Sequence, residues 1–113
     1  MRAARPPGAC FSAPDLAKVG VALLAGKILP PARLEALCTT QIPVPVLIYG
    51  LGCSGVNHGP GVRRWGHNGG VPGAAAEFAL YPDSGLSLVI LSNHDRCAQP
   101  VLKAFEAAYF GQA

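Results

Sequence analysis

The stretch at residues 65–73, Trp-Gly-His-Asn-Gly-Gly-Val-Pro-Gly, constrains the fold of this chain more than any other feature. Its four glycines accept positive φ and allow close approach of other groups, and its proline fixes its own φ. Residues 61–65 and 74–81 on either side are predicted as strands, so the glycines lie at a strand end and in the turn that follows. This place suits backbone N–H groups and a titratable side chain that face a cleft. Taken alone, however, these nine residues favour an ordinary hairpin.

Composition indicates a folded domain with an apolar surface. The chain has 113 residues, of which 50% are hydrophobic and 13% charged, so it is one domain, or part of one, with ample material for a core. Its mean hydropathy of +0.33 is high for a small soluble domain. We therefore expect some apolar surface to be covered by a partner.

The charge distribution argues against nucleic-acid binding. The formal net charge is +3, and the basic residues are scattered from Arg2 to Lys103 instead of forming a stripe with aromatic residues. Only Arg63 and Arg64, followed by Trp65, resemble such a patch, and neighbouring residues of a strand point to opposite faces. The chain is therefore predicted to bind no nucleic acid.

Cysteine and histidine spacing predicts no metal site, and we expect no cofactor. The four cysteines, Cys10, Cys38, Cys53 and Cys97, contain no Cys-x-x-Cys pair, and the three histidines do not supply the close ligand pairs typical of zinc sites. Buried free thiols are the favoured interpretation. The even count also allows disulfides, although nothing else in the sequence argues for an oxidising compartment.

The N-terminal residues do not form an export signal. Residues 1–5 resemble the charged start of a signal peptide, but Pro6, Pro7 and Gly8 stand where its apolar segment should be. No apolar run has the length of a membrane span. We expect a cytoplasmic location if this sequence is the whole protein, and a periplasmic or secreted one if a signal peptide precedes it.

The order of the predicted elements indicates an α+β fold. Residues 1–11 are expected to be a flexible lead-in, and Ser12 begins a helix as its N-cap. A second, short helix follows Pro30 and Pro31. The predicted strands are residues 46–51, 61–65, 74–81 and 86–91, and the last helix is predicted at residues 99–109. The last helix is expected to bury a stripe of Val101, Leu102, Phe105 and Tyr109. The result is an antiparallel sheet of three to four strands with packed helices, formed by residues 12–113.

Two other motifs favour structural interpretations. Residues 50–55 match the dinucleotide-binding pattern Gly-x-Gly-x-x-Gly, but the residues that follow cannot form the helix that this mechanism needs. We therefore interpret the match as accidental. Within the same run, Ser54 lacks the glycine two residues later that a nucleophile elbow requires, and Cys53 has no positioned base in view.

Each histidine, taken alone, favours a structural role. His58 lies among turn residues and is expected to be exposed. His94 beside Asp95 has the composition of an acid-base pair. In a loop before a helix, however, such residues more often cap the helix and face solvent. A lone His67 would also be structural. The spacing around His67, however, extends a resemblance that runs through most of the chain.

Five sequence blocks, in order, match a known family. They are Ser-Ala-Pro-Asp-Leu-Ala-Lys at 12–18 with Ala-Leu-Leu-Ala-Gly-Lys at 22–27, Tyr-Gly-Leu-Gly at 49–52, Gly-His-Asn-Gly-Gly-Val-Pro-Gly at 66–73, Tyr-Pro-Asp-Ser-Gly at 81–85 and Leu-Ser-Asn-His-Asp at 91–95. Through them the chain resembles the C-terminal part of the serine β-lactamase-like hydrolases, which include class C β-lactamases, penicillin-binding proteins, D-alanyl-D-alanine peptidases and related esterases. The resemblance implies that residues 12–113 are the C-terminal segment of such a domain.

The resemblance also implies roles for four consecutive residues. His67, Asn68 and Gly69 would occupy the family's Lys-Thr-Gly box on the strand that lines one wall of the active site. A histidine there can hold an anionic substrate group and assist proton movement, with a charge that depends on pH near neutrality. The next residue, Gly70, would give a backbone N–H to the oxyanion hole. Asn68 and Gly69 would bind the substrate.

The family's nucleophile is absent from this sequence. In the family it is the serine of a Ser-x-x-Lys pair, and here no serine has a lysine three residues later. The second family element, Tyr-x-Asn or Tyr-x-Ser, is absent too. In the family both elements lie upstream of the region that this chain resembles. The chain is therefore expected to resemble the last third of an enzyme without its nucleophile or general base.

Two functions stay open at this point. The first is a C-terminal segment of a serine hydrolase that cleaves a small-molecule ester, amide or β-lactam through an acyl-enzyme and is inactive alone. The second is a non-catalytic module that binds a partner, or a second copy of itself, through the sheet face that the rest of the family's domain would cover. Histidine in place of lysine weakens the permanent charge for a substrate carboxylate, which favours ester or amide hydrolysis over β-lactam hydrolysis.

Overall fold

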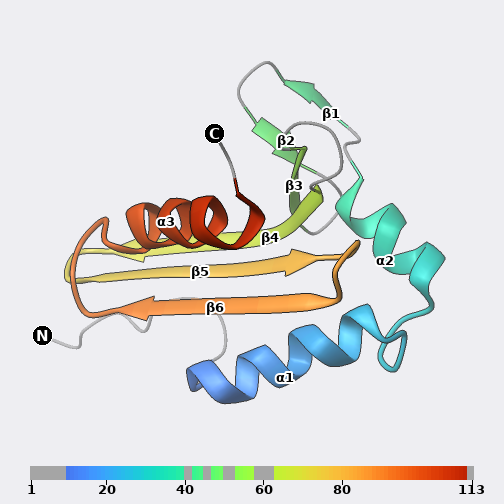
Figure 1. The fold of residues 1–113 in the computed structure, drawn as a ribbon, viewed down its shortest axis with the longest axis horizontal. Coiled ribbons are helices and arrows are strands. Elements are labelled where there is room, and N and C mark those ends of the chain that lie inside the picture. Colours follow the sequence, from blue (N-terminus) through green and yellow to red (C-terminus); the bar gives the residue numbers. More distant parts are fainter. Residues whose placement is uncertain (1–9, 40–41, 45–46, 50–52, 58–62, 112–113) are drawn as a thin grey trace, which may run out of the picture.

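The computed structural model describes residues 10–39, 42–44, 47–49, 53–57 and 63–111 of the chain. Within these ranges the backbone forms three helices and six strands (Figure 1). They are α1 (Ala13–Leu24), α2 (Pro31–Cys38), β1 (Ile42–Val44), β2 (Leu47–Tyr49), β3 (Ser54–Asn57), β4 (Arg63–Val71), β5 (Ala74–Tyr81), β6 (Leu86–Ser92) and α3 (Ala98–Phe110). This arrangement confirms the predicted α+β class, with helices packed on an antiparallel sheet.

The strands follow one another across the sheet in chain order, and every neighbouring pair is antiparallel. β4, β5 and β6 have nine, eight and seven residues and form the body of the sheet, which the shorter β1, β2 and β3 extend. β2 confirms the middle of the strand predicted at residues 46–51, whose ends lie outside the described residues. β1 was not predicted because it contains Pro43, which is tolerated at the edge position that β1 occupies.

The glycine-rich stretch forms a hairpin, as its residues alone favour, but the strand is longer than predicted. β4 continues through Gly69 and Gly70 as far as Val71, and only Pro72 and Gly73 form the turn. Gly73 has φ of 84°, which the second central position of a type II turn requires, and proline suits the first. The strand continues because residues 74–78 of β5 offer a backbone partner to each of these glycines.

The helices begin where the sequence predicts. The Ser12 hydroxyl caps α1 by accepting a hydrogen bond from the Asp15 N–H at 3.3 Å, and α2 begins at Pro31. No helix among the described residues is long and apolar enough to cross a membrane.

α3 differs from its prediction in the face that it buries, because Val101 and Tyr109 are exposed while Glu106 is buried.

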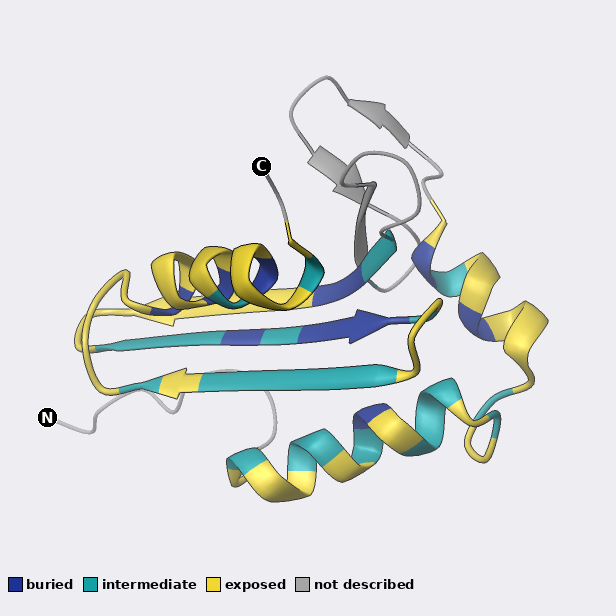
Figure 2. Ribbon diagram, in the orientation of Figure 1, coloured by how far each residue is buried: buried dark blue, intermediate teal, exposed yellow. Residues whose placement is uncertain are grey.

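The two faces of the sheet have separate cores. Leu80 on β5 and Trp65 on β4 pack with α2 and with the last turn of α1 on one face. Their neighbours Ala79 and Tyr81 pack with Leu102 of α3 on the other. Figure 2 shows the buried positions gathered in β5 and on the inward side of α3, whereas the far end of β4 is exposed.

The cysteines differ from the predicted buried thiols. Cys38 and Cys53 form a disulfide with a Cα–Cα distance of 4.9 Å, and Cys10 and Cys97 are free but exposed. Sequence spacing does not show this pair because tertiary packing brings the end of α2 beside the residue that precedes β3. The disulfide therefore ties α2 to the strand that pairs with the start of β4.

We predict that removing this disulfide lowers the free energy of unfolding by about 3 kcal/mol, since it closes a loop of roughly 15 residues in the unfolded chain. Urea unfolding of the double variant Cys38→Ala/Cys53→Ala measures the loss. The matched control is Cys10→Ala/Cys97→Ala, which removes two exposed thiols and is expected to change stability by less than about 0.5 kcal/mol. Equal stability of the two double variants would contradict the prediction.

α1 approaches β6 closely at Gly20. A Cβ built on Gly20 would lie 2.0 Å from the Ser87 Oγ and 2.9 Å from the Leu80 Cδ2. Among the described residues, the buried Ser87 hydroxyl has no hydrogen-bond partner. Close packing at this point therefore depends on a glycine and leaves one polar atom unsatisfied.

We predict opposite effects for two substitutions at this contact. Gly20→Ala should destabilise the fold by about 1–3 kcal/mol because α1 must move away from the sheet, despite the better helix propensity of alanine. Ser87→Ala should stabilise it by about 1 kcal/mol, since it removes an unsatisfied buried hydroxyl. Urea unfolding of the single and double variants tests this. If the changes in the free energy of unfolding of the two single variants simply added in the double variant, this would argue against the contact, because residues in contact are energetically coupled.

Candidate active site

β4 presents the four predicted site residues in one exposed run. His67, Asn68, Gly69 and Gly70 are all exposed, although Trp65 and Gly66, which precede them in the same strand, are buried. The described pairing of β3 with β4 covers residues 63–66, whereas β5 pairs with β4 as far as Val71. The run therefore begins where the β3 pairing ends.

Strand alternation places these side chains on two faces. Trp65 packs with α1 and α2 on one face of the sheet. His67 and Val71 lie two and six residues after Trp65, and residues an even number apart in a strand point to the same face. Asn68 lies opposite Glu77 of β5 and points to the side that α3 covers. His67 is thus on the face that α1 leaves open at the end of β4.

The imidazole of His67 is oriented by the backbone of the next residue, Asn68. Its Nδ1 lies 2.5 Å from the Asn68 carbonyl oxygen. A carbonyl oxygen can only accept a hydrogen bond, so Nδ1 donates it and the lone pair of the neutral ring is on Nε2. Nε2 is therefore the nitrogen that can accept a proton from a reacting group.

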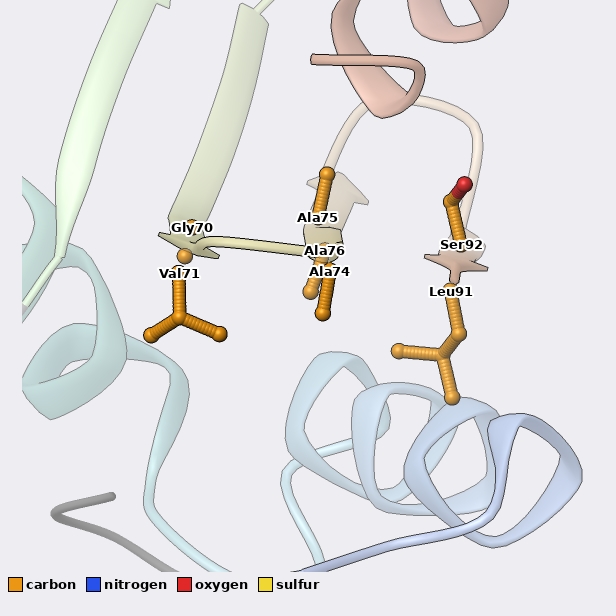
Figure 3. Close-up of a pocket in the computed structure, with 8 residues that line it drawn as sticks. Gly70, Val71, Ala74, Ala75, Ala76, Leu91 and Ser92 are labelled. Atoms are coloured by element: carbon orange, nitrogen blue, oxygen red, sulfur yellow. The ribbon is translucent and has the colours of Figure 1, made fainter. Parts of the chain in front are cut away.

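A shallow groove of about 350 Å³ lies beside this strand (Figure 3). The ends of β4 and β6 and the beginning of β5 line it, with Gly69, Gly70, Val71, Ala74, Ala75, Ala76, Leu91 and Ser92. The side chains of Val71 and Leu91 extend toward the side of the sheet where α1 lies, and 51% of Val71 and 48% of Leu91 is exposed. The groove is apolar and follows the same face as His67.

The opposite face holds a buried polar cluster. Arg64 of β4 forms an ion pair with Glu106 of α3, and the Tyr81 hydroxyl donates a hydrogen bond to the same carboxylate at 2.9 Å. Burial raises the pKa of the Tyr81 hydroxyl, and its bond to Glu106 adds to this. Burial also raises the pKa of Glu77, which Arg64 and a hydrogen bond with the Gln99 side chain partly offset. The cluster joins α3 to the strands that hold the site.

The sequence missed this cluster, although a signal for it exists. On β5, Glu77 alternates with Ala75, Ala79 and Tyr81 on one strand face, where a charge would be unusual. On α3, Glu106 follows Ala98 and Leu102 at steps of four, so it lies on the buried stripe. A charge in a buried pattern on each of two elements indicates a buried ionic contact between them.

The remaining candidates have other roles. Asp95 accepts a hydrogen bond from the Gly73 N–H. The neighbouring His94 is exposed, and its backbone N–H donates a hydrogen bond to the Ser92 Oγ at 3.0 Å. Cys53 is in the disulfide. β3 begins at Ser54, where a dinucleotide-binding fold needs a helix, so the Gly-x-Gly-x-x-Gly match is confirmed as accidental. His58 lies outside the described residues.

Within the described ranges, no group of three or more histidine, cysteine, aspartate or glutamate residues could hold a metal ion. The arrangement offers instead one imidazole, a row of strand amides and an apolar groove. These groups can bind and polarise a carbonyl substrate.

The fold is α+β and matches a part of the β-lactamase-like fold. A solved structure that it resembles is a D-stereospecific amidohydrolase from Streptomyces sp., with a TM-score of 0.68 and 35% sequence identity. The match covers 88% of this chain and 30% of that chain, so the present chain spans less than a third of its structural neighbour. No protein-family model matches the chain, and no curated protein matches its sequence.

We predict a pH-dependent effect of Glu77→Gln on stability. The folded state raises the pKa of Glu77, so it holds this proton more tightly than the unfolded state does. The contribution of Glu77 to stability is therefore fully present below its unfolded pKa of about 4.5 and falls as pH rises through the folded value. Glu77→Gln should match the original protein at pH 4 and be more stable at pH 7.

Urea unfolding at several pH values measures the difference between the two proteins. Arg63 lowers the pKa of Asp83 through a hydrogen bond, so Asp83 makes the stability of both proteins rise with pH. Because both proteins contain Asp83, this effect cancels in the difference between them. Glu35→Gln on α2 is the matched control because Glu35 is exposed. A stability difference for Glu77→Gln that stays constant with pH would show that the raised pKa is wrong.

Proposed function

We propose that this chain forms one wall of the acyl-transfer site of a serine β-lactamase-like hydrolase, as its C-terminal segment. The observation that supports this most is the exposed run from His67 to Gly70 on β4, in a fold that matches part of an amidohydrolase of this type. The wall is the outer part of β4 with the adjoining groove. The serine nucleophile and its lysine would come from a part of the domain that this sequence does not contain.

In this proposal His67 binds the substrate and moves a proton. Its Nδ1 donates a hydrogen bond to the Asn68 carbonyl oxygen, so Nε2 is the ring nitrogen with the lone pair. Nε2 would accept a proton during attack on the substrate carbonyl and return it to the leaving group. Protonated His67 would also hold an anionic substrate group.

Gly70 would stabilise the negative charge on the reacting carbonyl oxygen. Val71 and Ala74 close a two-residue turn, so we expect them to exchange backbone hydrogen bonds. Along an antiparallel pair, hydrogen-bonded and non-hydrogen-bonded residue pairs alternate. The next pair, Gly70 with Ala75, would then be non-hydrogen-bonded, so the N–H of Gly70 would face away from β5. Among the residues that the structure describes, a Cβ at Gly70 would meet nothing within 4 Å, so a substrate can approach this amide closely.

The substrate class that we favour is an amide or ester of small size. The structural neighbour is named as a D-stereospecific amidohydrolase. His67 supplies a weaker permanent charge than the lysine of the family's box, which favours ester or amide bonds over the β-lactam with its carboxylate. Asn68 and Gly69 would contact the substrate beside the reacting carbonyl.

The apolar groove supports a second candidate, a non-catalytic module that binds a partner through this face. Val71 and Leu91 leave about half of their surface exposed at the groove. A second copy of the chain would be one such partner. Size-exclusion chromatography with light scattering tests this candidate, and a monomer over a wide range of concentration would argue against self-association.

We predict that the purified chain turns over neither nitrocefin nor p-nitrophenyl acetate by this mechanism, because it contains no Ser-x-x-Lys pair. A chimera in which this chain replaces the matched 30% of the Streptomyces sp. amidohydrolase should hydrolyse that enzyme's amide substrate. In the chimera, His67→Ala should lower kcat by about 10²–10⁴-fold. Turnover by the isolated chain that His67→Ala abolishes would contradict the proposal.

A matched pair of variants tests Gly70 in the chimera. Gly70→Pro removes the backbone N–H and should lower kcat by about 10²–10³-fold. Gly70→Ala keeps the N–H and adds a methyl group where space is open, so it should retain most activity. Equal loss in both variants would argue that shape, and not the amide, matters at this position.

A further inference from the structure

Two contacts join the segment after β6 to the hairpin that holds the site. The Asp95 carboxylate accepts a hydrogen bond from the backbone N–H of Gly73 in the β4–β5 turn. Four residues later, the Gln99 side chain in the first turn of α3 lies close enough to Glu77 of β5 to act against the raised pKa of its carboxyl. In Figure 1 the loop between β6 and α3 passes the tip of this hairpin.

Both contacts lie next to the Gly70 amide in the pairing register. Gly73 is three residues beyond Gly70, and Glu77 is the partner of Asn68, two residues before it. Among the described residues, a Cβ at Gly69, Gly70 or Gly73 would meet nothing within 4 Å, so the space beside these three glycines is open. The residues that contact the hairpin therefore determine how rigid it is.

The loop that contains Asp95 is itself held in a defined path. The Ser92 hydroxyl accepts a hydrogen bond from the His94 N–H at 3.0 Å. Arg96 has φ of 60°, a left-handed conformation that a non-glycine residue adopts at a cost. At its far end the loop continues into α3, which Leu102 and Glu106 bury against the sheet.

We propose that Asp95 is a positioning residue that fixes the end of β4, and with it the amide of Gly70, by binding the N–H of Gly73. Its importance for catalysis rests on the function proposed above, whereas the contact itself does not. The carboxylate ties the turn to the loop before α3, and α3 is anchored at its other end by the ion pair between Glu106 and Arg64. β4 is therefore held to the same helical segment at its beginning and, through Asp95, at its end.

Nuclear magnetic resonance of the full chain tests this proposal. In Asp95→Ala, amide exchange at Gly73 should accelerate at least tenfold, and the backbone order parameter of Gly70 should fall from about 0.85 to below about 0.6. Asp95→Asn keeps a carbonyl acceptor and should restore most of both values. Asp15→Ala, an exposed carboxylate in the first turn of α1, is the control and should leave Gly70 and Gly73 unchanged.

Three results would overturn the proposal. They are unchanged order at Gly70 in Asp95→Ala, an equal rise in exchange across the buried amides of β5, and equal effects of Asp95→Asn and Asp95→Ala. In the amidohydrolase chimera, Asp95→Ala should lower kcat more than it changes KM. An inactive chimera with the expected order parameters would refute the function alone, and an active chimera with unchanged order parameters would refute only the role of Asp95.

Discussion

The antiparallel pairing of β4 with β5 is the interaction on which the rest of the structure depends. It joins seven consecutive residue pairs, from Trp65 with Leu80 to Val71 with Ala74. A shift of one residue would move His67 from the open face to the face under α3. The register is fixed at one end by Trp65 and Leu80 in the core and at the other by the turn at Gly73.

Gly66 determines how the strand enters this pairing. It has φ of 155°, and a Cβ there would lie 1.8 Å from the Phe78 carbonyl oxygen, so only glycine fits. The backbone of β4 thus comes very close to β5 just before His67. Immediately upstream, Arg64 reaches α3 and Arg63 reaches the exposed Asp83 at 2.9 Å. The backbone that leads into the candidate site is therefore held by residues 63–66, which come just before His67 in the sequence.

Local signals in the sequence predicted most of the secondary structure. The Ser12 cap, the prolines before α2 and the glycines with Pro72 each act on their own neighbours. Both helix starts and the hairpin are confirmed, although β4 runs through Gly69 and Gly70, beyond its predicted end. The Cys38–Cys53 disulfide, the Asp95–Gly73 bond and the buried face of α3 were missed. These depend on which distant elements meet, and periodicity within one element does not contain that information.

α3 illustrates the difference most clearly. Hydrophobicity alone favours a stripe with Val101 and Tyr109, yet the helix turns Glu106 inward because Arg64 and Tyr81 lie beneath it. A buried ion pair adds little net stability, since desolvation offsets its attraction, but it is costly to break by rotating the helix. The cluster therefore selects one orientation of α3 on the sheet.

The site residues could be placed on their strand from sequence, whereas their surroundings could not. The alternation that puts His67 and Asn68 on opposite faces follows from the period of a strand. Which face is open depends on α1 packing against β6 and leaving the end of β4 exposed, and Gly20 against Ser87 determines that packing. No pattern near His67 predicts where α1 lies.

The two faces of β4 consequently serve different purposes. The face toward α3 is filled and charged, with Glu77 buried to 7% exposure and Glu106 paired to Arg64. The face toward α1 is open beyond Trp65 and continues into the apolar groove beside Val71. A strand that is fixed on one face and open on the other can present amides in a constant geometry, which the oxyanion role proposed for Gly70 would require.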